Sequence, residues 1–184
     1  MKKEIIEKTK DFIKQSFKEN PHFSFNNWKI MYDHSLLVHK YSVKIAENID
    51  CDKVVLAIGA LLHDIGKTYK ADEKTLRKEH EKLGYIVSKQ FLETLKLTKD
   101  QKTKLRHILT SRGESVEKRI IKDADVIAFF ADRNLQSAFR KWAQRKGLRN
   151  ESRRKLGKIN ELRFNVSKEI SKPFYMQLKR RWKL

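Results

Sequence analysis

Residues 57–70 of the chain read AIGALLHDIGKTYK. Its first part, residues 57–62, completes an almost unbroken apolar run that starts at residue 54 and is typical of a buried helix. The run ends in His63 and Asp64, side by side, and a glycine and a lysine follow within three residues. A buried imidazole and a buried carboxylate both need partners. Their place at the end of a core helix therefore calls for either hydrogen bonds or a metal ion.

Nearly every other segment repeats its apolar residues at steps of three and four, as amphipathic helices do. Helices are expected within residues 4–17, 28–49 and 53–64, from Asp72 or Thr75 through 95, from Thr98, and in 115–132 after Gly113. Pro21 is expected to break the chain after the first of them. The tail offers two more helical patterns, separated near Gly147 and before Ser152. No convincing strand alternation or internal repeat occurs in the sequence, which predicts an all-α fold.

The length of 184 residues suits a single domain, and six glycines and two prolines leave no obvious hinge. A lone cysteine, Cys51, excludes an internal disulfide framework and fits a reducing compartment. No apolar run approaches the length of a membrane-spanning helix, and the charged N-terminal segment does not resemble a signal peptide. We expect a cytoplasmic protein with no membrane partner.

The charge is high and uneven. The chain carries a net charge of +20, and residues 133–184 hold 17 basic side chains against 3 acidic ones. A solvated helix face in a lysine-rich protein explains such an excess, and so does a site for a polyanion such as nucleic acid or a phosphorylated small molecule. The sequence alone leaves both explanations open.

Five polar side chains fall on faces that are otherwise apolar: His34, His63, Asp64, His80 and Asp125. A single inward histidine is more often a hydrogen-bonded core residue. Buried aspartates are harder to explain, because a lone buried carboxylate is costly unless a cation or donors compensate it. Imidazole nitrogens together with carboxylate oxygens suit a first-row divalent ion such as Mn, Fe, Ni or Zn.

The order His34, His63-Asp64, Asp125, with LLHDIGK intact, resembles the HD superfamily of metal-dependent phosphohydrolases. The resemblance covers roughly residues 28–132, which would form an HD-domain helical bundle. Residues 133–184 carry no motif that matches. They are expected to form a basic C-terminal helical extension of the same single domain, residues 1–184.

The resemblance implies a ligand set for one metal ion: His34, His63, Asp64 and Asp125. Asp125 matches the last ligand of the family, an aspartate that follows an alanine and enters an apolar stretch. Asp123 is instead expected to face solvent or to contact a ligand.

Two further histidines match HD members that bind two metals. His80, in EHEKLG, and His107, in LRHILTSRG, would then hold the second ion, with Asp64 as the bridge. Ile108 follows His107, whereas one subset of the family has two adjacent histidines there. In members with one metal such histidines contact the substrate phosphate, so one ion and two ions both remain open.

The same resemblance, together with phosphate chemistry, gives roles to other side chains. Asp64 would orient the attacking water and accept its proton, and the Lys67 ammonium would bind a phosphate oxygen. Arg112 is either a phosphate contact or a plain loop arginine. His22, in a loop, and His39, which faces away from the ligand set, are weaker candidates.

Three functions are consistent with these observations. The first is a phosphohydrolase acting on a nucleotide or another small phosphoester. The second is a nuclease or phosphodiesterase on single-stranded nucleic acid, with residues 140–146 and the terminal KRRWKL as a basic track in which Trp142 and Trp182 stack on bases. Both tryptophans are equally expected as core residues. The third is a non-catalytic nucleic-acid-binding or regulatory module.

Overall fold

The computed structural model describes residues 2–20, 27–110 and 112–183, and the regular elements in these ranges are all helical. The α-helices are α1 (Lys2–Glu19), α2 (Trp28–Ile45), α3 (Lys53–Leu62), α4 (Glu73–Thr94), α5 (Lys99–Leu109), α6 (Val116–Ala131), α7 (Arg133–Arg145), α8 (Glu151–Gly157) and α9 (Asn165–Trp182). Short 3₁₀ helices are η2 (Ala46–Asn48), η3 (Ile65–Thr68) and η4 (Lys158–Glu161). The all-α prediction is confirmed. Pro21 and His22 lie outside the described residues.

Several helices begin where the sequence predicts, because a side chain caps each start. The Asp72 carboxylate accepts a hydrogen bond from the Thr75 backbone N–H and opens α4. A reciprocal capping box of Thr98 and Gln101 opens α5. Ser115 caps α6 by accepting from a backbone N–H one turn further on.

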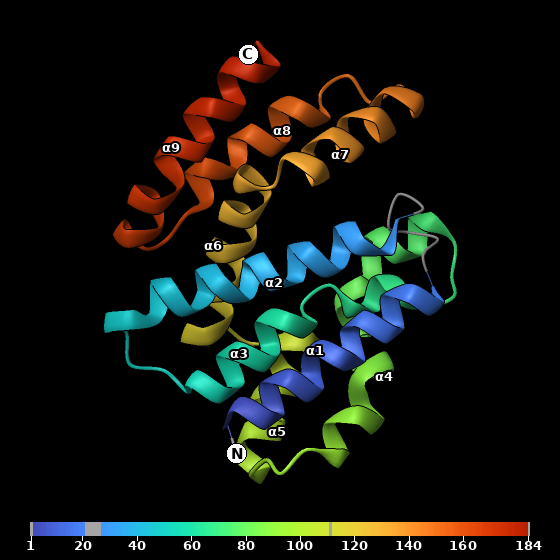
Figure 1. Cartoon of the computed structure of the whole chain (residues 1–184), viewed down its shortest axis with the longest axis vertical. Helices are drawn as coiled ribbons and strands as arrows, with labels where there is room; N and C mark the ends of the chain where they lie inside the picture. The colour runs from blue at the N-terminus through green and yellow to red at the C-terminus, as the bar shows by residue number, and fades with distance from the viewer. Residues whose placement is uncertain (1, 21–26, 111, 184) are drawn as a thin grey trace.

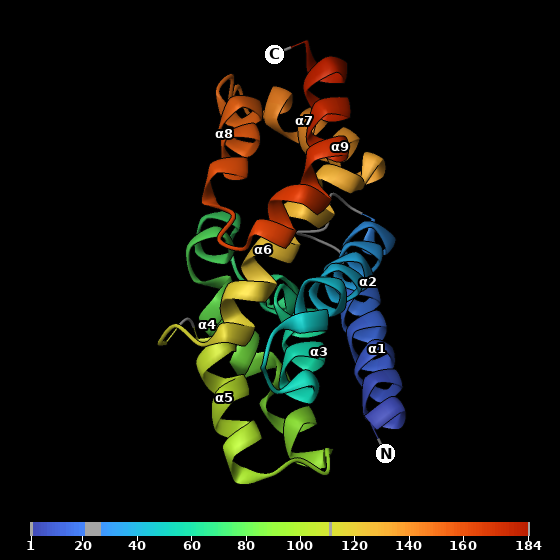
Figure 2. The same cartoon turned by 90° about the vertical axis from the view of Figure 1, so that its left-hand side faces the viewer.

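Two groups of helices occupy opposite ends of the molecule, with α2 and α6 between them (Figures 1 and 2). The last three helices, α7 to α9, form one end, and α3, α4 and α5 lie toward the other. Helix α2 packs on both α3 and α6, and η3 packs closely on α4. The chain after α6 is therefore placed above the ends of α2 and α3, where the candidate histidines lie.

One hydrophobic core runs through both groups and contains buried residues of α1 as well as of α9. In its upper part Phe129 and Phe139 contact Trp182, with ring centroids 6.2 and 6.5 Å away. Trp182 is buried, which agrees with its interpretation as a core residue. Trp142 is half-buried and packs on Phe139. The two tryptophans thus lie within the protein fold.

The tail differs from the sequence prediction, since three α-helices stand where two patterns were expected. The extra break falls at residues 162–164, where no glycine or proline signals it. Asp123 causes it: its carboxylate, only 1% exposed, accepts hydrogen bonds from the backbone N–H groups of Arg163 and Phe164 at 2.9–3.1 Å. Asp123 therefore does not face solvent, and it anchors the start of α9 to α6.

Replacing Asp123 with alanine is expected to lower the free energy of unfolding by about 1–3 kcal/mol, because the N–H groups of Arg163 and Phe164 lose their buried acceptor. Urea denaturation followed by circular dichroism measures the loss. Glu169→Ala, at an exposed position of α9, is the control and should stay close to wild type. An unchanged midpoint in Asp123→Ala would show that the anchor is unimportant.

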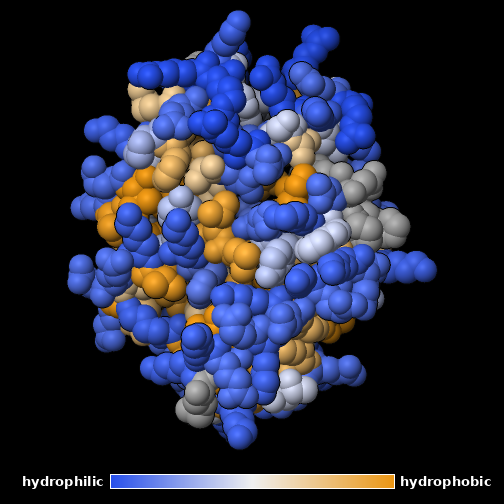
Figure 3. Space-filling model, viewed as in Figure 1, coloured by the Kyte–Doolittle hydropathy of each residue, from blue (hydrophilic) through white to orange (hydrophobic). Residues whose placement is uncertain are grey.

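The surface over α7 to α9 is mainly hydrophilic in the view of Figure 3. Arg140, Lys141, Arg145 and Lys146 are all exposed there. In the described ranges no helix has the length and apolar character that crossing a membrane requires.

Candidate metal centre and the adjoining cavity

The turn after α3 is held tightly against α4. A Cβ atom on Gly66 would lie 1.8 Å from the His80 carbonyl oxygen and 2.5 Å from the Gly84 nitrogen. Glycine is required here by the close approach of the α4 backbone. This close contact fixes the position of the HDIGK segment relative to His80.

Three side chains from separate helices converge beside this turn. His34 comes from α2, His63 from the end of α3, and Asp125 from α6. Asp125 Oδ1 lies 3.0 Å from His34 Nε2 and 3.9 Å from His63 Nε2. One ligand atom of each residue falls within 4.8 Å of the others, which is the arrangement a metal ion requires.

The histidine tautomer supports this interpretation. His63 Nδ1 donates to the Ala60 carbonyl at 2.9 Å, so its Nε2 carries a lone pair in the neutral ring. That Nε2 is buried, has no hydrogen-bond partner among the described residues, and faces two carboxylates. A lone pair on Nε2 that faces carboxylate oxygens is stabilised by a cation between them. Two imidazoles with a carboxylate suit a first-row divalent ion.

The electrostatics of the cluster agree. Burial alone would lower the pKa of His63, but the carboxylates of Asp64 and Asp125 outweigh it and raise that pKa above its ordinary value. Burial would raise the pKa of Asp64, but the charge of Lys67 and then His63 hold it well below its usual range. Both effects show that the site favours positive charge beside its carboxylates.

Asp64 lies next to the three convergent residues. Its Oδ2 is 3.4 Å from His63 Nε2, and the Lys67 ammonium donates to the same oxygen at 2.5 Å. Its other oxygen, Oδ1, lies 3.8 Å from His80 Nε2. Asp64 thus stands between the cluster and His80, which is the place a bridging carboxylate would occupy.

The remaining sequence candidates lie elsewhere. His107 is exposed on α5, and Arg112 is exposed in the loop before α6; neither lines the cavity described below. His39 is half-buried on α2, away from the cluster. Of the two histidines expected together, the structure brings only His80 to the site.

The model of the HD domain family matches residues 31–129, more than half of the chain. The chain belongs to the HD domain family. Domains of this family bind divalent metal ions. A search of curated proteins finds no match.

Among solved structures, the crystal structure of a HD-superfamily hydrolase from Bacillus thuringiensis aligns with a TM-score of 0.73. The two chains are 19% identical, and the alignment covers 100% of this chain and 95% of that one. The shared fold therefore includes α7 to α9, which lie beyond the HD-domain match.

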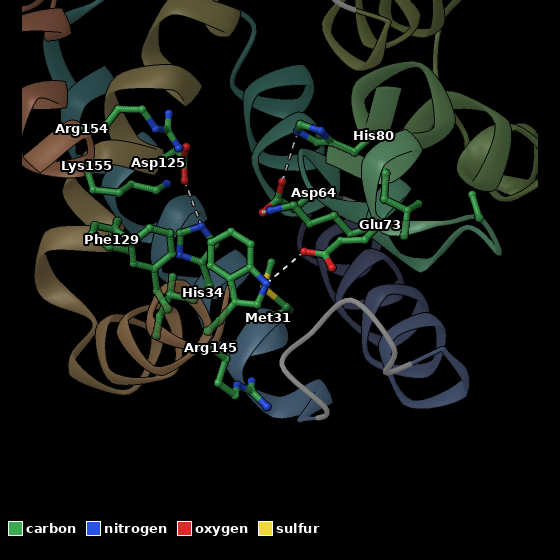
Figure 4. A pocket seen from close by; sticks show the side chains of 16 residues that line it. Met31, His34, Asp64, Glu73, His80, Asp125, Phe129, Arg145, Arg154 and Lys155 are labelled. Carbon is green, nitrogen blue, oxygen red and sulfur yellow. Dashed lines mark hydrogen bonds and ion pairs between the residues drawn. The ribbon is translucent and has the colours of Figure 1, made fainter. Parts of the chain in front are cut away.

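A cavity of about 760 Å³ opens between the HD domain and these last helices. His34, Asp64, His80 and Asp125 line one part of it (Figure 4). Side chains of the extension also line it, among them Phe139, Trp142, Arg145, Arg154 and Lys155. From the sequence, Trp142 and Arg145 were expected on a nucleic-acid track, and no motif marks the other three.

Lys155 and Arg154 both extend toward Asp125 in Figure 4, and the charge of Lys155 helps to keep the pKa of Asp125 below its usual range. Its ammonium lies 4.7 Å from the ring centroid of Phe129 and 5.6 Å from that of Phe139. Burial lowers the pKa of Lys155, although the charge of Asp125 opposes the shift. No sequence motif marks Lys155, because its place depends on how α8 packs.

A polar bridge connects the two sides of the cavity. Trp142 Nε1 donates to Glu73 Oε1 at 3.0 Å, and Lys146 pairs with Glu73 Oε2 at 2.9 Å. Glu73 begins α4 and the other two residues belong to the end of α7. The bridge holds the extension over the candidate metal centre.

Proposed function

We propose that this chain is a metal-dependent phosphohydrolase that cleaves a phosphoester of a nucleotide or another small phosphorylated substrate. The observation that carries the proposal is the unpartnered His63 Nε2, which is buried beside the carboxylates of Asp64 and Asp125, two residues that line a large cavity. A site of this kind, in a cavity that Lys67, Arg145 and Lys155 also line, suits an anionic ligand held by a metal ion.

His34, His63 and Asp125 would hold the ion, with Asp64 as a fourth ligand. When bound, a divalent ion supplies Lewis-acid activation of water and of a phosphoryl oxygen. Mn, Fe, Ni and Zn all suit this donor set.

The nearby side chains have complementary roles. The ionised Asp64 orients the attacking water and accepts its proton, because it lies beside the convergent residues and remains charged. Lys67, already at Asp64, neutralises negative charge on a phosphate oxygen as the reaction proceeds. His80 stands on the far side of Asp64, where it either holds a second ion or contacts the phosphate.

The test is hydrolysis of 4-nitrophenyl phosphate and bis(4-nitrophenyl) phosphate by protein stripped of metal and reloaded with Mn, Fe, Ni or Zn. Turnover of the monoester, the diester or both is expected with at least one of these ions and none with the stripped protein. No metal-dependent turnover of either ester would contradict the proposal.

A nuclease acting on single-stranded nucleic acid receives less support. Exposed basic residues on α7 fit a nucleic-acid track. However, Trp182 packs in the core and Trp142 is hydrogen-bonded to Glu73, so neither ring is presented for stacking on bases. Binding of a labelled single-stranded oligonucleotide is therefore expected to be weak at 0.15 M salt. Tight binding that falls steeply with added salt would instead favour the nuclease.

A further inference from the structure

The ammonium of Lys155 differs from the other cations beside the metal centre. Lys67 is paired with Asp64, and Arg154 donates to Glu151 at 2.7 Å. Among the described residues Lys155 has neither a hydrogen bond nor a close ion pair; its ammonium lies over the faces of two phenylalanine rings, and its charge interacts with that of Asp125 from a greater distance. A half-buried lysine in this state is costly unless a ligand completes it.

The rings also fix where the charge lies. Phe129 and Phe139 hold the ammonium at the wall of the cavity, on the side from which Asp125 projects (Figure 4). Lys155 therefore faces the same space as the candidate metal ligands, although it comes from α8, outside the range matched by the HD domain.

A count of charges indicates which anionic ligand would pair with the Lys155 ammonium. The carboxylates of Asp64 and Asp125 balance one divalent ion, with the histidines neutral as ligands. Arg154 is paired with Glu151, and Arg145 lies apart from Asp125 in Figure 4, so the charges of Lys67 and Lys155 remain beside the candidate ligands. Together they match the two negative charges of a phosphomonoester. A phosphodiester carries one negative charge and would leave one lysine uncompensated.

We propose that Lys155 binds a phosphate oxygen of a phosphomonoester dianion at this centre, so that the C-terminal extension supplies part of the substrate site. The proposal rests on the proposed function for the presence of the ion and the ester. Its own content is that a residue outside the range matched by the HD domain positions the phosphate and favours monoesters over diesters.

Lys155→Met tests it, because methionine keeps an unbranched side chain against the two phenylalanines while removing the charge. Lys158→Met is the matched control: it lies in the next turn and pairs with Glu161 at 2.7 Å. Two quantities are measured for each metal-loaded protein: the dissociation constant of inorganic phosphate, by calorimetry, and kcat/KM for 4-nitrophenyl phosphate and bis(4-nitrophenyl) phosphate.

In Lys155→Met the dissociation constant of phosphate is expected to rise about 10- to 100-fold, since one charge-assisted hydrogen bond is lost. The value of kcat/KM for the monoester should fall by a similar factor and that for the diester by less. Lys158→Met should match wild type. The melting temperature of ligand-free Lys155→Met should not fall, since a partly desolvated charge is removed, whereas a purely structural lysine would lower it.

Unchanged phosphate affinity in Lys155→Met, or an equal loss in Lys158→Met, overturns the assignment. These outcomes are distinct from failure of the proposed function. If wild type hydrolyses neither ester, the phosphate titration still decides whether Lys155 binds the anion. If wild type hydrolyses esters and Lys155→Met binds phosphate normally, only the assignment of Lys155 is wrong.

Discussion

Asp64→Asn is expected to reduce metal-dependent phosphoester hydrolysis by about 10³-fold or more, the largest effect on activity that this site predicts. The substitution keeps the shape of the side chain but removes the charge that faces His63 and pairs with Lys67. It thereby removes both roles that we propose for Asp64, as a metal ligand and as the acceptor of the water proton. Initial rates at saturating metal measure the loss.

The control for this variant is Asp33→Asn, an aspartate of α2 that is likewise paired with a lysine about one turn away but lies outside the cavity of the candidate site. Its rate should equal that of wild type. Far-ultraviolet circular dichroism should be the same for all three proteins. A rate for Asp64→Asn within a few-fold of wild type, with the fold intact, would exclude Asp64 from the chemistry.

Gly66→Ala is expected to lower the free energy of unfolding by about 3 kcal/mol or more, the largest effect on stability. The new Cβ would meet backbone atoms of His80 and Gly84, which cannot rotate away as a flexible side chain does. Either η3 separates from α4 or the segment rearranges. Because the same contact places His80 opposite Asp64, metal affinity should fall together with stability. Urea denaturation and metal titration measure the two effects.

Gly157→Ala is the matched control for this variant. Gly157 has helical dihedrals, φ −60° and ψ −20°, and a Cβ there would have no heavy atom within 4 Å. Alanine at this position should leave stability unchanged or raise it by up to about 1 kcal/mol. If both alanine variants behave alike, the close packing of η3 on α4 is not what requires Gly66.

The fold was predictable from local signals wherever those signals agreed. Apolar residues at helical spacing predicted α1 to α6, and the caps at Asp72, Thr98 and Ser115 fixed several helix starts. The HD resemblance of LLHDIGK is confirmed by the family match. The break before α9 could not be predicted, because it depends on Asp123, which lies some 40 residues away in sequence. Pro173 lies inside α9, so a helix break predicted from this proline would have been placed wrongly.

The site was predictable where ligands follow a motif. His34, His63 and Asp125 come from three helices, and the structure brings them together. The cavity residues that come from the extension follow no motif, since Lys155 and Trp142 reach the cavity only through the packing of α7 and α8. The basic excess in residues 133–184 was visible in the sequence, but not which of those charges face the cavity.

The central claim is that the cluster binds a divalent ion, and calorimetric titration of the stripped protein with Mn²⁺ and Zn²⁺ tests it most directly. Wild type is compared with Asp125→Asn, which removes the charge of the carboxylate from α6 while His34 and His63 remain. We predict saturable binding to wild type and an affinity at least about 10-fold lower in the variant. Equal affinities in the two proteins, or no binding to wild type, would contradict the account.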